Sequence, residues 1–272
     1  MKRLEMPPAG SGVALQFGFR DGERGAHSAR TMMLSELEQA LAAVPPGSTP
    51  EQFTKACLNG NALGKQTMAN RKNSLRNLVH LYALDESVPL FRLLRQLWSD
   101  VPARPLLALL TALARDPLLR MSAPAVLVLR KGESADGDIF GSALAALSDR
   151  FTPATQKSIA QNFAATWTHA GHVQGVMKKI RASAFATPSA AAYAATIAYL
   201  VGLRGVGILE STWLRVLDVP ASQIQSLLVS AARADLIDFK ISGQVVAFKP
   251  YGLLMPPEMA LADLLAHERS IA

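Results

Sequence analysis

The stretch WLRVLDVPASQIQSLLVSAARADLIDFKISGQVVAFKP, residues 213–250, decides the fold of the C-terminal part of this chain. It begins with the short apolar segment 213–217, which ends before Pro220, because proline stops one helix and can open the next. A second helix is predicted from Ala221. Its apolar residues recur with the 3.6-residue period of a helix, at Ile224, Leu227, Leu228 and Ala231, and the period continues to Leu236 and Ile237.

A β-hairpin is predicted directly after this helix. The β-rich segments 238–241 and 244–248 flank the dipeptide Ser242-Gly243, and a two-residue turn that contains glycine is typical of hairpins. Helix, turn, helix and hairpin in this order are the layout of a winged helix-turn-helix.

The second helix of this unit carries a polar face. A helix fits the major groove of DNA, where glutamine and serine can exchange hydrogen bonds with base edges. We therefore predict DNA contacts from Ser222, Gln223, Gln225 and Ser226. Winged helices also serve as protein-docking modules or as rigid cores, and this alternative stays open.

Length and composition favour a mainly α protein of two domains. The 272 residues exceed the roughly 100 to 200 residues of one typical domain. Half of them are hydrophobic but only 6% are aromatic, and the excess of alanine and leucine favours helix. The balance of 28 Lys and Arg against 21 Asp and Glu gives a net charge of +7, which suits a polyanionic partner.

The same sequence indicates a cytoplasmic protein. Its one cysteine, Cys57, lies on the apolar side of a predicted helix and cannot form an intrachain disulfide. The N-terminus lacks the apolar stretch of a secretory signal. The most apolar segments, 105–114 and 190–203, are shorter than the roughly 20 residues of a membrane-spanning helix, so no membrane association is expected.

Four segments are expected along the chain. Residues 1–27 are rich in glycine and proline and are predicted to form a flexible N-terminal arm. Residues 28–138 form a helical domain with a helix-turn-helix, and the hydrophilic loop 131–138 ends it. Residues 139–250 form a second helical and winged-helix domain, and 251–272 form a C-terminal tail helix.

A second DNA-facing helix is predicted from Lys65 to about Leu84. Residues 61–104 hold seven Lys and Arg against three Asp and Glu. On a helical wheel the cations and amides share one face, while Met68, Leu75, Leu78, Val79 and Tyr82 occupy the other. Lys and Arg side chains would contact the phosphates, and Asn and Gln side chains would hydrogen-bond to the bases. The predicted contacts are Lys65, Gln66, Thr67, Asn70, Arg71, Lys72 and Arg76. The alternative is that this basic helix face is an ordinary hydrated surface that binds no partner.

Basic residues elsewhere are expected to add phosphate contacts. They lie in the segment 172–181 and in the hairpin, and they are Lys178, Lys179, Arg181, Lys240 and Lys249. Binding that depends on such contacts weakens as salt rises.

The motifs examined for catalysis do not favour an enzyme. His169 and His172 flank a glycine that breaks the helix of a zinc pair, and no third ligand stands nearby. The glycines of 202–207 follow an alanine-rich helix instead of a buried strand, so a helix end is expected there and not a phosphate loop. Cys57 has no neighbouring cation to activate it. We expect no catalytic residue, metal, cofactor or small-molecule substrate.

Five short segments resemble a known family. They are SARTMMLSEL (28–37), NALGK (61–65), RKNSLR (71–76), LYAL (81–84) and VPLFR (88–92). Together they resemble the BrxA-like accessory proteins of bacterial BREX phage-defence systems, over about residues 28–248. The resemblance implies an N-terminal helical domain similar to the antitermination factor NusB, a winged-helix-like C-terminal domain, and non-enzymatic DNA binding.

The sequence therefore predicts a non-catalytic protein that binds double-stranded DNA, with other phage-defence proteins as further partners. The alternative is an adaptor within a multi-subunit complex, in which the winged module and the apolar segment 261–266 dock a protein.

Overall fold

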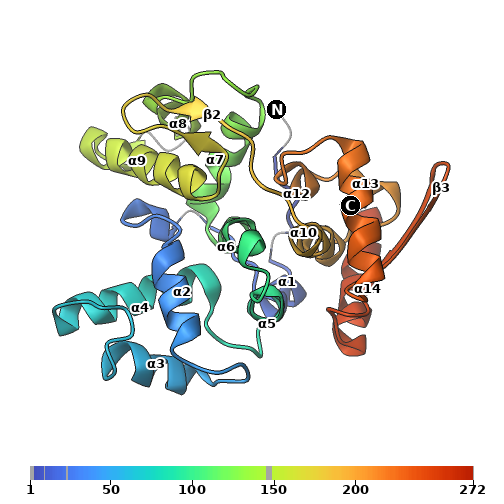
Figure 1. Ribbon diagram of the computed structural model, residues 1–272, viewed down its shortest axis with the longest axis horizontal. Coiled ribbons are helices and arrows are strands. Elements are labelled where there is room, and N and C mark those ends of the chain that lie inside the picture. Colours follow the sequence, from blue (N-terminus) through green and yellow to red (C-terminus); the bar gives the residue numbers. More distant parts are fainter. Residues whose placement is uncertain (1–2, 9, 23, 145–148, 272) are drawn as a thin grey trace.

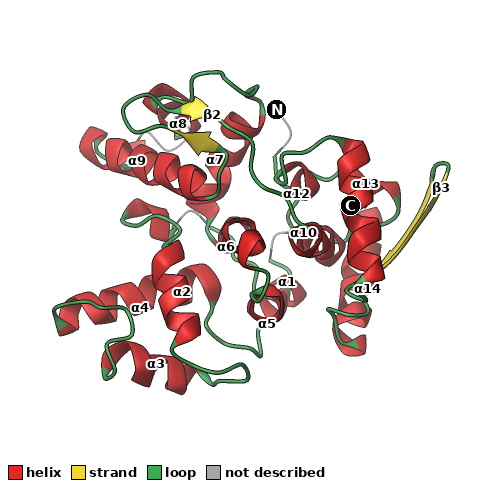
Figure 2. Cartoon of the chain, in the orientation of Figure 1, coloured by secondary structure: helices red, strands yellow, loops and turns green. Residues whose placement is uncertain are grey.

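The computed structural model describes residues 3–8, 10–22, 24–144 and 149–271, and helices make up most of them (Figures 1 and 2). The predicted mainly α fold with a small β-hairpin is confirmed. The elements are α1 (Gly12–Phe17), η1 (Ala26–Ser28), α2 (Leu34–Ala42), α3 (Pro50–Leu58), α4 (Met68–Tyr82), α5 (Pro89–Leu97), η2 (Val101–Ala103), α6 (Arg104–Arg115), α7 (Pro117–Leu127), α8 (Gly137–Ala143), α9 (Pro153–His169), β1 (Val173–Gln174), β2 (Ile180–Arg181), α10 (Pro188–Leu200), α11 (Val206–Leu209), α12 (Thr212–Arg215), α13 (Ala221–Arg233), β3 (Asp238–Ser242), β4 (Val245–Lys249) and α14 (Pro256–Ile271).

Two helices, α6 and α10, form the centre of the molecule (Figure 1). Residues 106–115 of α6 and 190–200 of α10 are all buried. A helix that is apolar on all sides requires neighbours all round. Accordingly α10 contacts α5, α6, α12, α13 and α14, and one hydrophobic cluster runs from the N-terminal segment to α14.

The N-terminal segment differs from the expected flexible arm. It contains α1, capped by Ser11 and ended by Gly18 in the left-handed region at φ 99°. Phe17 and Phe19 are buried. Further upstream, the Glu5 carboxylate accepts a hydrogen bond from Thr212 N. The short apolar run after Ser11 therefore folds back into the core.

The boundary expected between residues 138 and 139 falls inside α8, which packs against both α7 and α9. The expected boundary position therefore lies within a continuous helix, and the division into two domains stays a prediction. The predicted tail helix exists as α14, but Ala262 and Leu265 are buried against the rest of the chain. The segment 261–266 is thus occupied by intramolecular packing, with Leu264 as its exposed apolar residue.

The C-terminal unit has the predicted element order. α12 precedes α13, which starts at Ala221 and buries Ile224, Leu228 and Ala231. α13 ends at Arg233, so the apolar period that continues to Ile237 does not extend the helix. In the hairpin, Ser242 pairs with Val245, which places the turn at Gly243-Gln244, one residue later than predicted. Gly243 has φ 57°, a conformation that suits glycine.

The N-terminal helix pair is α3 and α4. α3 starts with Thr49 and Gln52 in a capping box and with Pro50 at the first position. α4 starts at Met68 after the N-cap Thr67, three residues later than predicted. Met68 and Val79 are exposed, contrary to the predicted apolar face. The similarity of these helices to NusB stays a prediction.

Candidate nucleic-acid interface

The α13 helix presents a polar stripe to solvent. Ser222, Gln223, Ser226, Ser230 and Arg233 are exposed, while Gln225 is half-buried. The Ser226 hydroxyl donates to Ser222 O at 3.1 Å, and the Ser230 hydroxyl donates to Ser226 O at 2.9 Å. Their protons are thus directed at the helix backbone, so these hydroxyls present acceptor lone pairs outward.

The β3–β4 hairpin projects from the helices beside this unit (Figure 1). Both predicted cations, Lys240 and Lys249, are exposed on it. Lys240 Nζ lies 3.5 Å from Asp238 Oδ2 in an exposed ion pair. Lys249 Nζ lies 5.6 Å from the centre of the Tyr251 ring. Exposed pairs of this kind are weak, so both lysines can exchange these contacts for phosphate oxygens.

The predicted basic face of α4 divides into exposed and engaged residues. Gln66, Thr67, Asn70, Lys72 and Arg76 are exposed. Thr67 caps the helix by accepting from Asn70 N.

Two predicted contacts on this face have structural partners instead. Lys65 Nζ lies 2.9 Å from Glu36 Oε1. Arg71 donates to Leu58 O and Lys65 O, which satisfies the last turn of α3. Arg71 is half-buried and two of its nitrogens already bind backbone carbonyls, so its contact with DNA stays a prediction.

The predicted phosphate contact from Arg181 conflicts with the burial of its side chain. Its side chain is 3% exposed and forms a two-pronged ion pair with Asp218, at 2.6 and 2.8 Å. It also donates to Val126 O and His172 O. Lys179 is half-buried, and its Nζ donates to Thr168 Oγ1 and Gly175 O. Lys178 remains as the exposed cation of the three.

The segment 172–181 is a hairpin that the sequence did not predict. β1 and β2 pair over two residues each, too few to show an alternating pattern. At its tip Val176 and Met177 are 91% and 93% exposed, beside Lys178. This tip therefore combines apolar and basic side chains.

The predicted DNA-facing units do not adjoin. Figure 1 shows α4 and the β3–β4 hairpin at opposite ends of the longest axis of the molecule. The two helices therefore cannot read one groove together, and each requires its own test.

Neither the protein-family models nor the curated proteins with which the chain was compared give a match. Similarity to BrxA-like proteins, and the function that it implies, therefore stay proposals.

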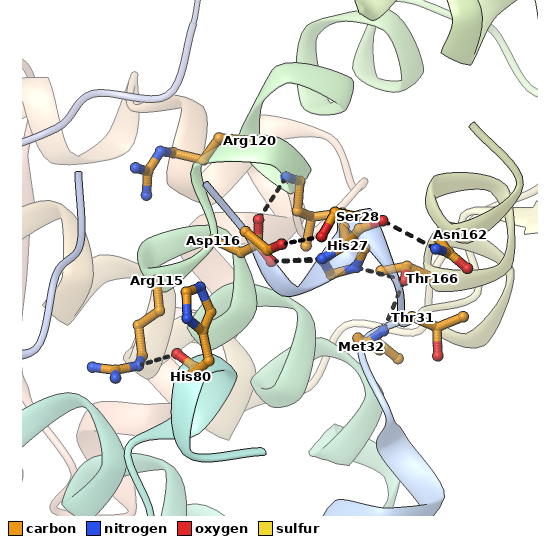
Figure 3. Close-up of polar contacts among 12 residues, drawn as sticks. His27, Ser28, Thr31, Met32, His80, Arg115, Asp116, Arg120, Asn162 and Thr166 are labelled. Atoms are coloured by element: carbon orange, nitrogen blue, oxygen red, sulfur yellow. Dashed lines mark hydrogen bonds and ion pairs between the residues drawn. The ribbon is translucent and has the colours of Figure 1, made fainter. Parts of the chain in front are cut away.

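A buried polar network joins three distant segments (Figure 3). His27 Nδ1 lies 2.9 Å from Asp116 Oδ2, and His27 Nε2 lies 2.9 Å from Thr166 Oγ1. Burial alone would raise the pKa of Asp116, but the charge of His27 and hydrogen bonds from His27 and Leu119 lower it to about 2. The order Asp, His, hydroxyl resembles a hydrolase triad. All three side chains are fully buried, so the network holds the segments together.

His169, His172 and Cys57 belong to no group of metal-ligating side chains among the residues that the structure describes. His172 is buried, its Nε2 lies 2.8 Å from Val216 O, and burial lowers its pKa to about 4. His169 is exposed. Cys57 is buried, as predicted, and burial raises its pKa. Within the described ranges no cluster of three metal-ligating side chains occurs, and no helix has the length and apolarity to cross a membrane.

A cavity of about 800 Å³ contains arginines that sequence reasoning missed. Arg20, Arg24 and Arg150 line it together with Arg76 of α4. The first two belong to the segment expected to be a flexible arm, and Arg150 is 74 or more residues from the others in sequence. The one available signal was the density of charged residues at 20–24, which does not indicate a partner.

Proposed function

We propose that this protein binds double-stranded DNA without catalysing a reaction on it. The observation that carries the proposal is the exposed polar stripe of α13 beside the projecting β3–β4 hairpin. A helix of this kind can enter the major groove, while the hairpin reaches the adjacent backbone.

Each exposed residue has a chemical role in this arrangement. The Gln223 amide can pair with the edge of an adenine, and the Ser226 hydroxyl can accept from a base amino group. Arg233, Lys240 and Lys249 can contact phosphates, which positions the helix without reading sequence. The net charge of +7 supports association with a polyanion.

We further propose a cytoplasmic role as an accessory component of a BREX-type phage-defence system. The support is the resemblance of the segments between residues 28 and 92 and the winged-helix order of the C-terminal elements.

Fluorescence anisotropy with labelled duplex DNA tests the proposal at about 50 and 200 mM salt. Binding at low salt that weakens by at least tenfold at high salt is expected for several phosphate contacts. The double variant Arg233→Ala, Lys249→Ala should weaken binding, whereas Lys55→Ala, an exposed lysine on α3, should not. Equal affinity of the double variant and the wild-type protein would contradict the assignment of this face.

A specific observation favours the adaptor as the second candidate. The tip of the β1–β2 hairpin exposes Val176 and Met177 almost completely, and exposed apolar side chains at a projecting tip suit a protein partner. The anisotropy titration separates the two candidates, because an adaptor without DNA contact gives no binding even at low salt.

A further inference from the structure

The arginine cavity is built from three parts of the chain that are distant in sequence. Arg20 and Arg24 come from the segment between α1 and η1, Arg76 comes from α4, and Arg150 directly precedes α9. Its volume of about 800 Å³ lies within the range of small-molecule sites. Apolar walls are provided by Val79, Leu118 and Phe151.

Buried arginines behind the cavity fix its walls. Arg115 donates to His80 O (Figure 3). It also donates to Gly18 O and Val79 O, which ties the N-terminal segment to the end of α4. Arg120 donates to Ala114 O and Arg20 O. Both side chains are thus engaged with backbone, which holds Arg20 and the end of α4 in place beside the cavity.

The backbone at Gly25, next to Arg24, lies very close to the Asp116 side chain. A Cβ atom at Gly25 would lie 1.9 Å from Asp116 Oδ1, so only glycine allows this approach. The Arg20 N–H also donates to Ala114 O at 3.3 Å. Gly25 and Arg20, on either side of this part of the wall, therefore have fixed backbone positions.

The charge of the cavity is strongly one-sided. Among the described residues that line it there are four arginines and no carboxylate. Asp21, next to Arg20, lies 3.5 Å from Arg120, and Asp116 is engaged by His27. Arg76 donates to Asn73 Oδ1, and this neutral partner leaves the charge of Arg76 in place.

His80 adds a second polar feature to the wall. Its Nε2 atom is buried and has no hydrogen-bond partner within the described part of the chain. Burial, followed by the charge of Arg20, lowers the pKa of His80, which favours a neutral imidazole. Buried polar atoms normally have partners, so an unpaired one at a cavity wall indicates a position where a ligand can bond.

We propose that this cavity binds an organic phosphate of nucleotide size. Phosphate oxygens would be held by Arg24 and Arg76, and the organic part would lie against Val79, Leu118 and Phe151. Arginine suits this ligand because its planar group binds phosphate through two parallel hydrogen bonds. The apolar walls distinguish the cavity from a site for inorganic anions. The inference does not depend on DNA binding by α13.

Isothermal titration calorimetry of the full chain with ATP, ADP, AMP, adenosine and inorganic triphosphate tests this proposal at low salt. Affinity should fall from ATP to AMP as charge is lost, and adenosine should not bind. Arg24→Ala and Arg76→Ala should each weaken ATP binding by about tenfold or more, the effect of one charged hydrogen bond. Lys72→Ala is the matched control, since Lys72 lies one turn from Arg76 on α4 and does not line the cavity.

Each other outcome would overturn the proposal. The proposal is contradicted if no phosphate compound gives a heat of binding, or if adenosine or inorganic triphosphate binds as tightly as ATP. It is also contradicted if Arg76→Ala and Lys72→Ala have equal effects on ATP binding. A parallel titration with 5′-phosphorylated duplex DNA separates the sources of phosphate. If Arg24→Ala weakens DNA binding and no nucleotide binds, the cavity belongs to the DNA surface. All variants are compared by circular dichroism, and Arg24 and Arg76 are exposed enough for the fold to tolerate alanine.

Discussion

His27 Nδ1 lies 2.9 Å from Asp116 Oδ2 although 89 residues separate them, and both side chains are fully buried. Asp116 also accepts from His27 N and, as the N-cap of α7, from Leu119 N. One carboxylate therefore fixes the N-terminal segment and starts a helix. Beyond His27, Thr166 continues the network to α9.

Replacing this carboxylate should destabilise the protein in a pH-dependent manner. Asp116→Asn removes the buried negative charge that these hydrogen-bond donors face. The substitution should therefore lower the free energy of unfolding by about 3 kcal/mol at neutral pH. The folded-state pKa of Asp116 is about 2, below its unfolded value, so its contribution is complete above about pH 4 and is lost as pH falls toward 2. Urea unfolding of the wild-type protein and the variant should show that the difference between their free energies of unfolding narrows as the pH falls from about 7 to 2.5. A difference that is constant with pH would contradict this role.

Arg181 should matter for stability and not for DNA affinity. Arg181→Ala removes the ion-pair partner of the partly buried Asp218 carboxylate and one donor from each of two backbone carbonyls, which should lower the free energy of unfolding by roughly 3 kcal/mol. Thermal unfolding measures this loss, and anisotropy of the folded variant should give wild-type DNA affinity. Lys178→Ala is the control, since the exposed Lys178 should leave stability unchanged. Unchanged stability of Arg181→Ala would refute the structural assignment.

The sequence predicted best those elements whose signals are local. α13 follows directly from Pro220 and the helical period of Ile224 and Leu228, and the hairpin follows from Gly243 between β-rich segments. α3 follows from Thr49 and Pro50. The break between α6 and α7 is harder to predict, because its local signal is confined to the cap Asp116 and the first-turn Pro117 while the apolar pattern continues across it.

The candidate sites were harder to predict because their partners are distant in sequence. Nothing near Arg181 indicates that Asp218 will neutralise it, and nothing near Arg20 indicates that it will line a cavity with Arg150. A one-dimensional charge count treats buried and exposed cations alike. Tertiary packing decides which of them can meet a ligand.

Charge reversal at Lys72 tests the N-terminal face separately from α13. If α4 contacts phosphates, Lys72→Glu should weaken binding to any duplex by about tenfold at low salt and reduce the slope of log affinity against log salt by about one. Lys157→Glu, at an exposed lysine on α9, is the matched charge control. If the two variants bind alike, α4 has no specific part in DNA binding.

Gln223 should contribute to sequence recognition more than to overall affinity. Its exposed amide lies on the α13 stripe, where a paired amide can discriminate adenine from other bases by about 1 to 3 kcal/mol. Gln223→Ala should therefore reduce the affinity for a duplex selected from a random pool by roughly tenfold, while random-sequence DNA binds as before. Competition titrations with both duplexes measure this ratio. Gln225→Ala is the control, since Gln225 is half-buried beside the stripe. A parallel loss of affinity for both duplexes in Gln223→Ala would show that α13 contacts the DNA backbone without reading its bases.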